Sequence, residues 1–285
     1  MNSTLSTSPL FLPDDGLAVT AAEPWFTQKI NLLHSLLSAF VANVSGRVTD
    51  IVFVDLYAGN GMYSLGARKD RFPDSSITVL KMDLPVTKYV FCERDEAQAR
   101  ILKVRVNKYF RDKNVALITG KSEELLEKLK MYVPAPSKGY KVAVFCYCDP
   151  FSLDAGVQTL GRLCELGFTV LTPITLPISK MVDYRFYVQE ERMKLSKYFE
   201  DYEEVRSIEK DLNNNLQFYR RLVNKLNQKL MLKGINSTLT MHKLDSGLMD
   251  LPYYYSGLFS SRMSTAALQN DAVVGMTHQF DLFES

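Results

Sequence analysis

The chain has 285 residues, 46% of them hydrophobic, and its 34 Lys and Arg residues stand against 32 Asp and Glu residues, which gives a formal net charge of +2. This composition excludes an intrinsically disordered chain and a uniformly basic protein that coats nucleic acid. The length suits one large α/β domain with appended helices as well as it suits two domains.

The first 49 residues are expected to form an arm and one helix that packs on the core. Residues 1–13 have no basic residue ahead of an apolar stretch, which argues against a secretory signal. From Trp25 to Val44 apolar residues recur at helical spacing, and Ser45-Gly46 ends the pattern. Polar residues interrupt the uncharged run at 30–46, which predicts an amphipathic helix and no membrane span. We therefore expect a cytoplasmic protein.

Five short, nearly continuous apolar runs predict strands that are buried on both faces of a parallel sheet. These runs are Ile51–Leu56, Tyr89–Glu93, Val115–Ile118, Val142–Cys146 and Phe168–Thr172. Segments with helical periodicity lie between them, at 77–82, 96–110, 123–131 and 155–166. Alternating strands and helices predict an α/β fold with a doubly wound, mostly parallel, Rossmann-like sheet. Its ligand crevice is expected at the carboxyl ends of the strands.

Residues 180–233 differ in composition and in hydrophobic pattern from the rest of the chain. They are charged and lack strand signals, so they predict a helical insertion. Beyond them, Ser237–His242 and Tyr253–Phe259 flank a turn-rich stretch and predict two late strands that close the sheet. The expected organisation is an arm and helix at 1–49, a Rossmann-like domain at 50–179 and 234–285, and an insertion at 180–233.

A cationic stripe runs along the second half of the insertion, on Arg220, Arg221, Lys225, Lys229 and Lys233. Such a helix face can follow the phosphates of a nucleic acid. The acidic segment just upstream offers the alternative that the stripe is neutralised within the protein.

Four cysteines occur, at Cys92, Cys146, Cys148 and Cys164, and no two form a C-x-x-C pair. The three histidines lie far from them in the sequence, so no metal site is expected. The cysteines are predicted to be small buried side chains in a reducing compartment.

The strongest local signal is the stretch 55–61, Asp-Leu-Tyr-Ala-Gly-Asn-Gly, at the end of the first predicted strand. Small residues there allow a sharp turn and a close approach of the backbone to a ligand. A dinucleotide loop would place a third glycine where Ser64 stands, and an acid about 20 residues on, whereas Glu93 follows Gly59 by 34 positions. An acid at the strand end followed by A-G-x-G favours S-adenosylmethionine.

In this interpretation Asp55 shapes the surroundings of the cofactor's amino-acid tail, and Glu93 accepts hydrogen bonds from both ribose hydroxyls. The alternative is that Gly59 and Gly61 only shape a turn and that Glu93 caps the next helix. Lys121 and Ser122, after the third strand, either line the adenine pocket or form a turn in which Ser122 caps a helix.

Asp149-Pro150-Phe151, at the end of the fourth strand, resembles the D-P-P-[YFW] signature of amino-methyltransferases acting on adenine, with one proline in place of two. Methyl transfer to an exocyclic amine needs acceptors that orient the nitrogen lone pair, here the Asp149 carboxylate and the Pro150 carbonyl. Phe151 offers a stacking face for a base. An ordinary strand-to-helix turn is the alternative.

Several of these segments together resemble the three-Cys-motif partner proteins over about residues 25–272. The segments are Trp25 and Lys29, 55–61, 74–77, Glu93, 149–151 and 253–261. Departures from the family pattern occur at Ser75-Ser76-Ile77 and at Ser152.

The resemblance implies a bacterial, methyltransferase-like protein whose partner is a three-cysteine protein that looks like a radical S-adenosylmethionine enzyme. It places the cofactor at Asp55, at Tyr57, Ala58, Gly59, Asn60 and Gly61, and at Glu93, and it places Trp25 and Lys29 on the substrate side.

The sequence thus predicts an S-adenosylmethionine-dependent methyltransferase that acts on a nitrogen of a nucleic-acid base or a related acceptor. Its catalytic residues would be Asp149, Pro150 and Phe151. The alternative is a partner subunit that binds the cofactor and performs no transfer. Nicotinamide binding is disfavoured by Ser64 and the late Glu93, and a covalent thiolate mechanism by the lack of a Pro-Cys motif. The sequence leaves the acceptor and the oligomeric state open.

Overall fold

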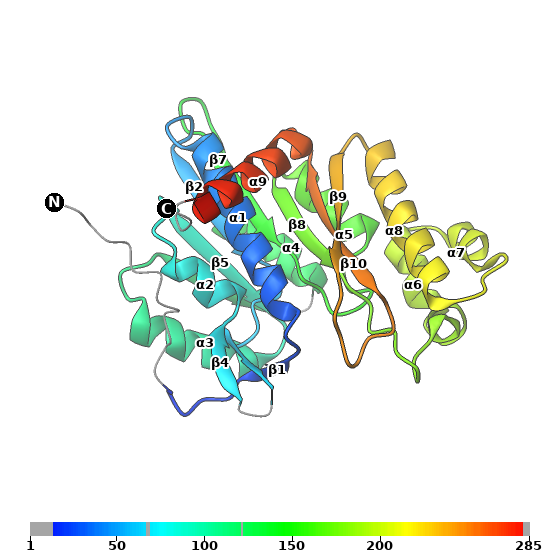
Figure 1. Ribbon diagram of the computed structural model, residues 1–285. Coiled ribbons are helices and arrows are strands. Elements are labelled where there is room, and N and C mark those ends of the chain that lie inside the picture. Colours follow the sequence, from blue (N-terminus) through cyan, green and yellow to red (C-terminus); the bar gives the residue numbers. More distant parts are fainter. Residues whose placement is uncertain (1–13, 67–68, 121, 282–285) are drawn as a thin grey trace.

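A seven-stranded sheet forms the centre of the computed structural model, which describes residues 14–66, 69–120 and 122–281 (Figure 1). The strand order is β6 (Val115–Thr119), β5 (Lys88–Glu93), β2 (Asp50–Asp55), β7 (Val142–Tyr147), β8 (Thr169–Ile174), β10 (Tyr253–Ser260) and β9 (Asn236–Lys243). The first five of these strands are parallel, and β10 is antiparallel to both of its neighbours. The predicted α/β class and mostly parallel sheet are confirmed.

The chain runs outward from β2 to β5 and β6, and then returns to the other side of β2 for β7 and β8. The strand order therefore reverses between β2 and β7, where Val54 pairs with Cys146. In open α/β sheets the ligand crevice lies at the carboxyl ends of the strands beside such a reversal. That edge carries the residues predicted for the site.

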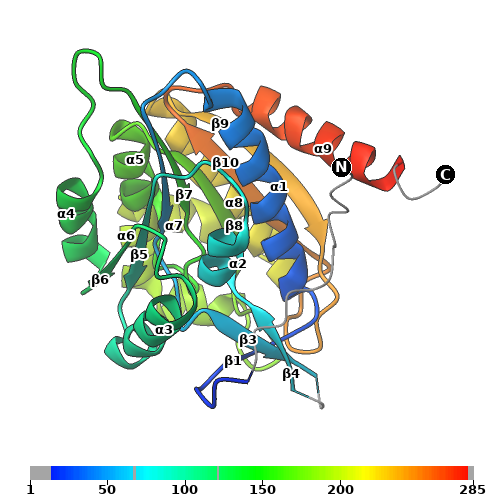
Figure 2. The same cartoon turned by 90° about the vertical axis from the view of Figure 1, so that its left-hand side faces the viewer.

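Helices cover both faces of the sheet (Figure 2). One face packs against α1 (Phe26–Val44), α2 (Ser75–Lys81), α3 (Glu96–Tyr109) and α9 (Thr265–Asp281), and the other against α4 (Ser122–Tyr132), α5 (Val157–Glu165) and α8 (Asn215–Leu232). Successive strand residues alternate between the faces. Phe53 and Phe145 pack beneath α1, whereas Val54 and Cys146 pack beneath α4 and α5.

All four cysteines are free and buried, and they lie in the core cluster beneath α4 and α5. Burial raises the pKa of each thiol, so the thiols stay protonated and unreactive. Their predicted packing role is confirmed. Within the described ranges no group of three His, Cys, Asp or Glu side chains is arranged to hold a metal ion.

The predicted insertion consists of helical elements where the structure describes it: η1 (Phe186–Glu190), α6 (Arg192–Phe199), α7 (Tyr202–Glu209) and α8. Phe218, Leu222 and Leu226 on α8 are fully buried in the core cluster that also contains α5. The helices therefore extend the main core. The division into a Rossmann-like domain and an insertion stays a proposal.

Two cations of the predicted stripe are ion-paired with the acidic segment upstream. Lys229 lies 3.0 Å from Asp201, and Lys233 lies 2.9 Å from Glu200. Arg221 donates to backbone carbonyls at the end of α7. The acidic segment upstream thus supplies partners for the stripe, and the geometry favours this alternative over a track for phosphates.

Two features were not predicted from the sequence. A small three-stranded sheet joins β1 (Thr20–Ala22) from the arm to β3 (Met62–Leu65) and β4 (Asp70–Pro73). Helix α9 packs beside α1 through Leu268 and Ala272 (Figure 1).

No described helix is long and apolar enough to cross a membrane.

Candidate active site

The glycine loop, residues 56–61, leaves the carboxyl end of β2 and turns sharply back over the sheet edge. Gly59 has φ +57° and Gly61 has φ +88°, which are conformations that favour glycine. A Cβ added to Gly61 would lie 2.7 Å from Ile77 Cγ1. The loop therefore requires glycine at position 61 for both conformation and space.

Glu93, at the end of β5, fastens this loop to its own strand. Its Oε2 accepts a hydrogen bond from the Gly59 amide at 2.8 Å, and its Oε1 accepts one from the Asp95 amide at 2.8 Å. Asp95, and not Glu93, caps α3, because its side chain accepts from the amides of Ala97 and Gln98. Glu93 is half-buried at the edge and lies beside the loop, as a shared cofactor site requires.

Asp55 is fully buried and turned into the protein. Its Oδ1 accepts from the Tyr57 amide at 3.1 Å, and its Oδ2 accepts from Ser75 Oγ at 2.5 Å. Burial raises the pKa of Asp55 to about 8, because the hydrogen bonds from Ser75 and Tyr57 offset only part of the desolvation. The side chain holds the glycine loop against α2, so any influence on a cofactor passes through the loop.

Asn60 is also committed to the protein, because only 1% of it is exposed. Its Oδ1 accepts from the Met62 amide at 3.0 Å and from Arg105 at 2.9 Å. Its Nδ2 donates to Gln98 Oε1 at 2.7 Å and to Thr20 Oγ1 at 3.1 Å. The Asn60 side chain therefore holds the loop in shape and leaves no group for a ligand.

Arg105 is a residue of this network that the sequence analysis missed. The side chain comes from α3, is fully buried, and also pairs with Asp15 at 2.7 Å and with the Asn60 carbonyl at 2.6 Å. It therefore ties the N-terminal arm to the glycine loop. A signal was present in the sequence, because position 105 falls on the apolar stripe formed by Leu102 and Val106.

Asp149, after β7, pairs with Lys29, which in turn lies over the ring of Trp25, the other residue that the resemblance placed on the substrate side. Lys29 Nζ lies 2.5 Å from Asp149 Oδ2, and Tyr147 donates to the same oxygen at 3.3 Å. The Lys29 ammonium lies 5.1 Å from the Trp25 ring centroid. Phe151, two positions after Asp149, is 70% exposed and free to stack on a planar ligand.

Asp74 completes the group of carboxylates and was not assigned to the site from the sequence. It caps α2 by accepting from the Ser75 amide at 2.7 Å, and its Oδ2 faces the open side of Gly59, where a Cβ would lie 3.6 Å away. Burial, Asp149 and Glu93 raise the pKa of Asp74 to about 6, although the Ser75 amide and Lys29 lower it. Asp74 and Asp149 thus share the charge of Lys29.

Two predicted cofactor residues are not characterised by the structure. Lys121 lies outside the described residues, and for Ser122 only its place as the first residue of α4 is described. Their assignment to the adenine pocket stays a prediction.

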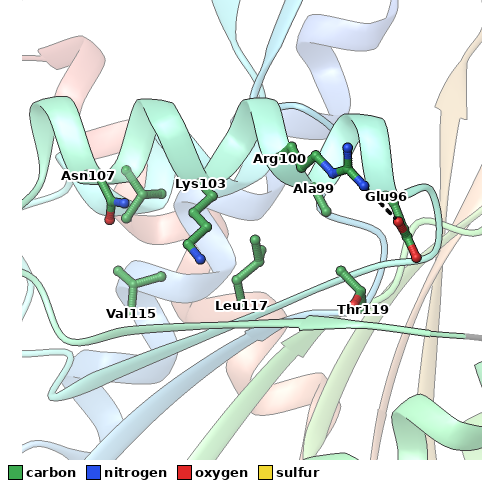
Figure 3. Close-up of a pocket in the computed structure, with 9 residues that line it drawn as sticks. Glu96, Ala99, Arg100, Lys103, Asn107, Val115, Leu117 and Thr119 are labelled. Carbon is green, nitrogen blue, oxygen red and sulfur yellow. Dashed lines mark hydrogen bonds and ion pairs between the residues drawn. The ribbon is translucent and has the colours of Figure 1, made fainter.

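A separate groove of about 500 Å³ lies between α3 and the edge strand β6 (Figure 3). Its apolar walls are formed by Ala99, Val115 and Leu117, and the Lys103 side chain extends from α3 toward β6. One end reaches Thr119, which pairs with Glu93 across the sheet. The groove therefore touches the carboxyl edge at one end only and is distinct from the group of carboxylates.

Comparisons with known proteins give neither a matching family model nor a matching curated protein. The resemblance to the three-Cys-motif partner proteins accordingly stays a prediction that rests on short motifs.

Solved structures similar to this chain include two O-methyltransferases and one further complex with S-adenosyl-L-methionine. An O-methyltransferase from Bacillus cereus in complex with SAH has a TM-score of 0.46 and 12% identity, covering 86% of this chain and 84% of that one. The O-methyltransferase TomG from Streptomyces achromogenes in complex with SAM has a TM-score of 0.44 and 13% identity, covering 87% and 83%. Trm1 from Pyrococcus horikoshii with S-adenosyl-L-methionine has a TM-score of 0.45 and 10% identity, covering 82% and 56%. Similarity at this level carries no argument about function.

Proposed function

We propose that this protein is an S-adenosylmethionine-dependent methyltransferase that binds its cofactor at the carboxyl ends of β2 and β5. The observation that carries the proposal is the convergence of Asp74, Glu93 and Asp149 with the glycine loop at Gly59, at one sheet edge. Lys29 is the one cation bound to this group among the described residues.

The charge and hydrogen-bonding capacity of this edge fit the cofactor. S-adenosylmethionine carries a cationic sulfonium, an ammonium group and two ribose hydroxyls, and a surplus of carboxylates attracts the cations. Asp74 faces the open side of Gly59, where it can hold an ammonium group. Each Glu93 oxygen accepts one backbone bond and keeps capacity for a ribose hydroxyl. When bound, the cofactor supplies an electrophilic methyl group.

The acceptor side of the site is proposed to orient a nitrogen nucleophile. Asp149 Oδ2 is engaged by Lys29 and Tyr147, which leaves Oδ1 to accept a hydrogen bond from an amine. The Pro150 carbonyl is the second proposed acceptor for the amine. Phe151 stacks on the ring that carries the amine, so a nucleic-acid base is the proposed substrate. The amine proton leaves through Asp149 or water after transfer.

Two measurements test this proposal in sequence. Titration calorimetry with S-adenosylhomocysteine is expected to show one binding site, and absence of heat with folded protein at millimolar ligand would refute the proposal. Transfer of a radiolabelled methyl group from S-adenosylmethionine to mixed RNA and DNA is then measured. Asp149→Asn is expected to slow transfer by about 10²–10⁴-fold while it leaves S-adenosylhomocysteine binding intact.

Asp154→Asn is the matched control. Like Asp149, the Asp154 side chain is 13% exposed and ion-paired, in its case to Lys194 at 3.1 Å, but Asp154 belongs neither to the proposed cofactor residues nor to the proposed acceptor residues. Transfer by this variant is expected to match that of the wild type. Equal losses in the two variants would contradict a specific role for Asp149.

A second candidate function is a partner subunit that binds the cofactor and performs no transfer. The ion pair between Lys29 and Asp149 favours it, because it already occupies one oxygen of the proposed acceptor site. In that case Asp149→Asn retains biological function, and the protein co-purifies with a three-cysteine protein. The cytoplasmic location is likewise a proposal.

A further inference from the structure

The outer edge of β6 carries backbone groups that have no partner strand. β6 is the last strand on its side of the sheet, and β5 is its inner neighbour. The Tyr89 amide donates to the Asn114 carbonyl at 2.9 Å, and Tyr89 lies opposite Val115 in the parallel register. Alternate residues of a strand turn their N–H and C=O groups to opposite edges, so those of Val115 and Leu117 point away from β5. Among the described residues these groups have no hydrogen-bond partner.

The groove of about 500 Å³ between α3 and β6 lies directly beside this edge (Figure 3). The side chains of Val115 and Leu117 point from the strand into it and are only half-buried, although they pack against the core on that face. Strand addition uses this combination, because the backbone ladder supplies hydrogen bonds and every second side chain of the added segment enters an apolar pocket.

Charge at this edge favours an acidic segment. Apart from the buried Arg105, residues 96–114 carry five cations and two acids. Lys103 extends from α3 toward β6 and has no ion-pair partner among the described residues. Glu96, the acid that lines the groove, is already paired with Arg100 at 3.0 Å. An acidic side chain on an added strand therefore meets an unbalanced cation, whereas a basic side chain is repelled.

The same charge disfavours a second copy of this chain at the edge. A two-fold axis normal to the sheet would pair the two β6 strands and keep both α3 helices on one face. The cations of both helices would then face each other across the joint.

We propose that β6 and the groove beneath α3 form a docking site for an extended acidic segment of another protein. The segment adds to the sheet as a new edge strand, places apolar side chains over Val115 and Leu117, and binds Lys103 through a carboxylate. This inference goes beyond the proposed function and does not depend on it.

The test uses the full-length protein and a fluorescent six-residue peptide in which valine alternates with glutamate. One control peptide alternates valine with lysine. Another replaces the valines of the acidic peptide with prolines, which have no N–H to enter a ladder. Fluorescence anisotropy measures affinity, and hydrogen exchange measures protection of the amides of β6. The acidic peptide is expected to bind more tightly than either control and to slow the exchange of the Val115 and Leu117 amides.

Lys103→Glu is expected to weaken binding of the acidic peptide by about tenfold or more. Lys108→Glu is the matched control, because it makes the same change of charge on the same helix. Lys108 lies over the Tyr109 ring, 5.0 Å from its centroid, and does not line the groove. Its variant should bind the peptide as the wild type does, and equal losses in the two variants would contradict a specific contact with Lys103.

No binding of the acidic peptide at millimolar concentration, or equal affinity for the acidic and basic peptides, would overturn the inference. So would protection of β9, the other edge strand, in place of β6. A dimer of the protein alone in which the Val115 and Leu117 amides exchange slowly would also overturn it, because a second copy would then occupy the edge. None of these outcomes affects S-adenosylhomocysteine binding, so failure here leaves the proposed function standing.

Discussion

The two sides of the carboxyl edge use their polar groups in opposite ways. On the glycine-loop side, Asp55, Asn60 and Arg105 are almost completely buried, and their hydrogen bonds go to other parts of the protein. On the acceptor side, the hydrogen bonds that Asp149 accepts from described side chains both go to Oδ2, and Phe151 is exposed. The first arrangement fixes a backbone shape, whereas the second leaves capacity for a ligand.

Charge follows the same division. The charge of Arg105 is balanced by Asp15 within the glycine-loop side. On the acceptor side Lys29 is the cation of the described ranges that acts on both Asp149 and Asp74. A surplus of negative charge next to a rigid backbone loop is what a cationic nucleoside ligand requires, and neither side supplies both features by itself.

The largest expected effect is a loss of stability when the buried cation of the glycine-loop side, Arg105, is removed. Arg105→Met removes the partner of Asp15 and of Asn60 and leaves a buried carboxylate uncompensated. We expect a loss of about 3–5 kcal/mol in the free energy of unfolding, measured by urea denaturation. S-adenosylhomocysteine binding should weaken as well, because the loop loses its anchor.

Arg100→Met is the control on the same helix. The Arg100 side chain is 79% exposed and pairs only with Glu96 one turn away, so its removal is expected to change stability by less than about 0.5 kcal/mol. Similar losses in the two variants would show that the buried network does not govern stability.

The parts of the fold that were predictable are those in which burial alone selects the residues. Strands such as 51–56 lie between two layers of helices, so nearly every residue is apolar and the run is visible in the sequence. The strand ends could then be aligned, because parallel strands end at one edge. Asp55, Glu93 and Asp149 were placed together on that basis.

What could not be predicted depends on contacts between distant segments. The three residues of β1 form a strand only because β3 pairs with them. From the sequence Asp74 is only a helix cap, and its position next to Gly59 depends on the tertiary structure.

A smaller effect is the pH dependence that Asp55, on the glycine-loop side, gives to the free energy of unfolding. Its pKa is raised from 3.8 to about 8, so the folded protein holds a proton that the unfolded chain releases above about pH 4. The stabilising contribution is complete below pH 4 and is lost as the pH rises through 8. Asn mimics the protonated form, because it can donate to Ser75 Oγ.

Asp55→Asn is therefore expected to gain stability relative to wild type as the pH rises from about 4 to 8, on the order of 1 kcal/mol or more. Urea denaturation at several pH values measures the difference. Asp154→Asn is the comparison variant and should show no such rise. A constant difference between Asp55→Asn and wild type would mean that Asp55 is ionised in the folded state.

The smallest effect concerns Glu23, which ties the arm to the loop between β9 and β10 beside the acceptor side. Its carboxylate accepts from Trp25 Nε1 at 2.9 Å, from Ser246 Oγ, and from the amides of Gly247 at 2.7 Å and Leu248 at 3.2 Å. Burial alone would raise the pKa of Glu23, but these hydrogen bonds outweigh it and lower the pKa below 4.5. The stabilisation is therefore present at neutral pH and is lost as the pH falls through the folded-state pKa.

Glu23→Gln is expected to lower the free energy of unfolding by about 1 kcal/mol at pH 7, and the difference from wild type should vanish below the folded-state pKa. Because Trp25 is the only tryptophan in the chain, its fluorescence reports the same titration directly. Glu96→Gln, with a side chain that is 74% exposed, should leave that fluorescence unchanged. A wild-type fluorescence that does not change at acidic pH would show that Glu23 does not hold Trp25 in place. Another residue would then have to fix the Trp25 ring against Tyr254.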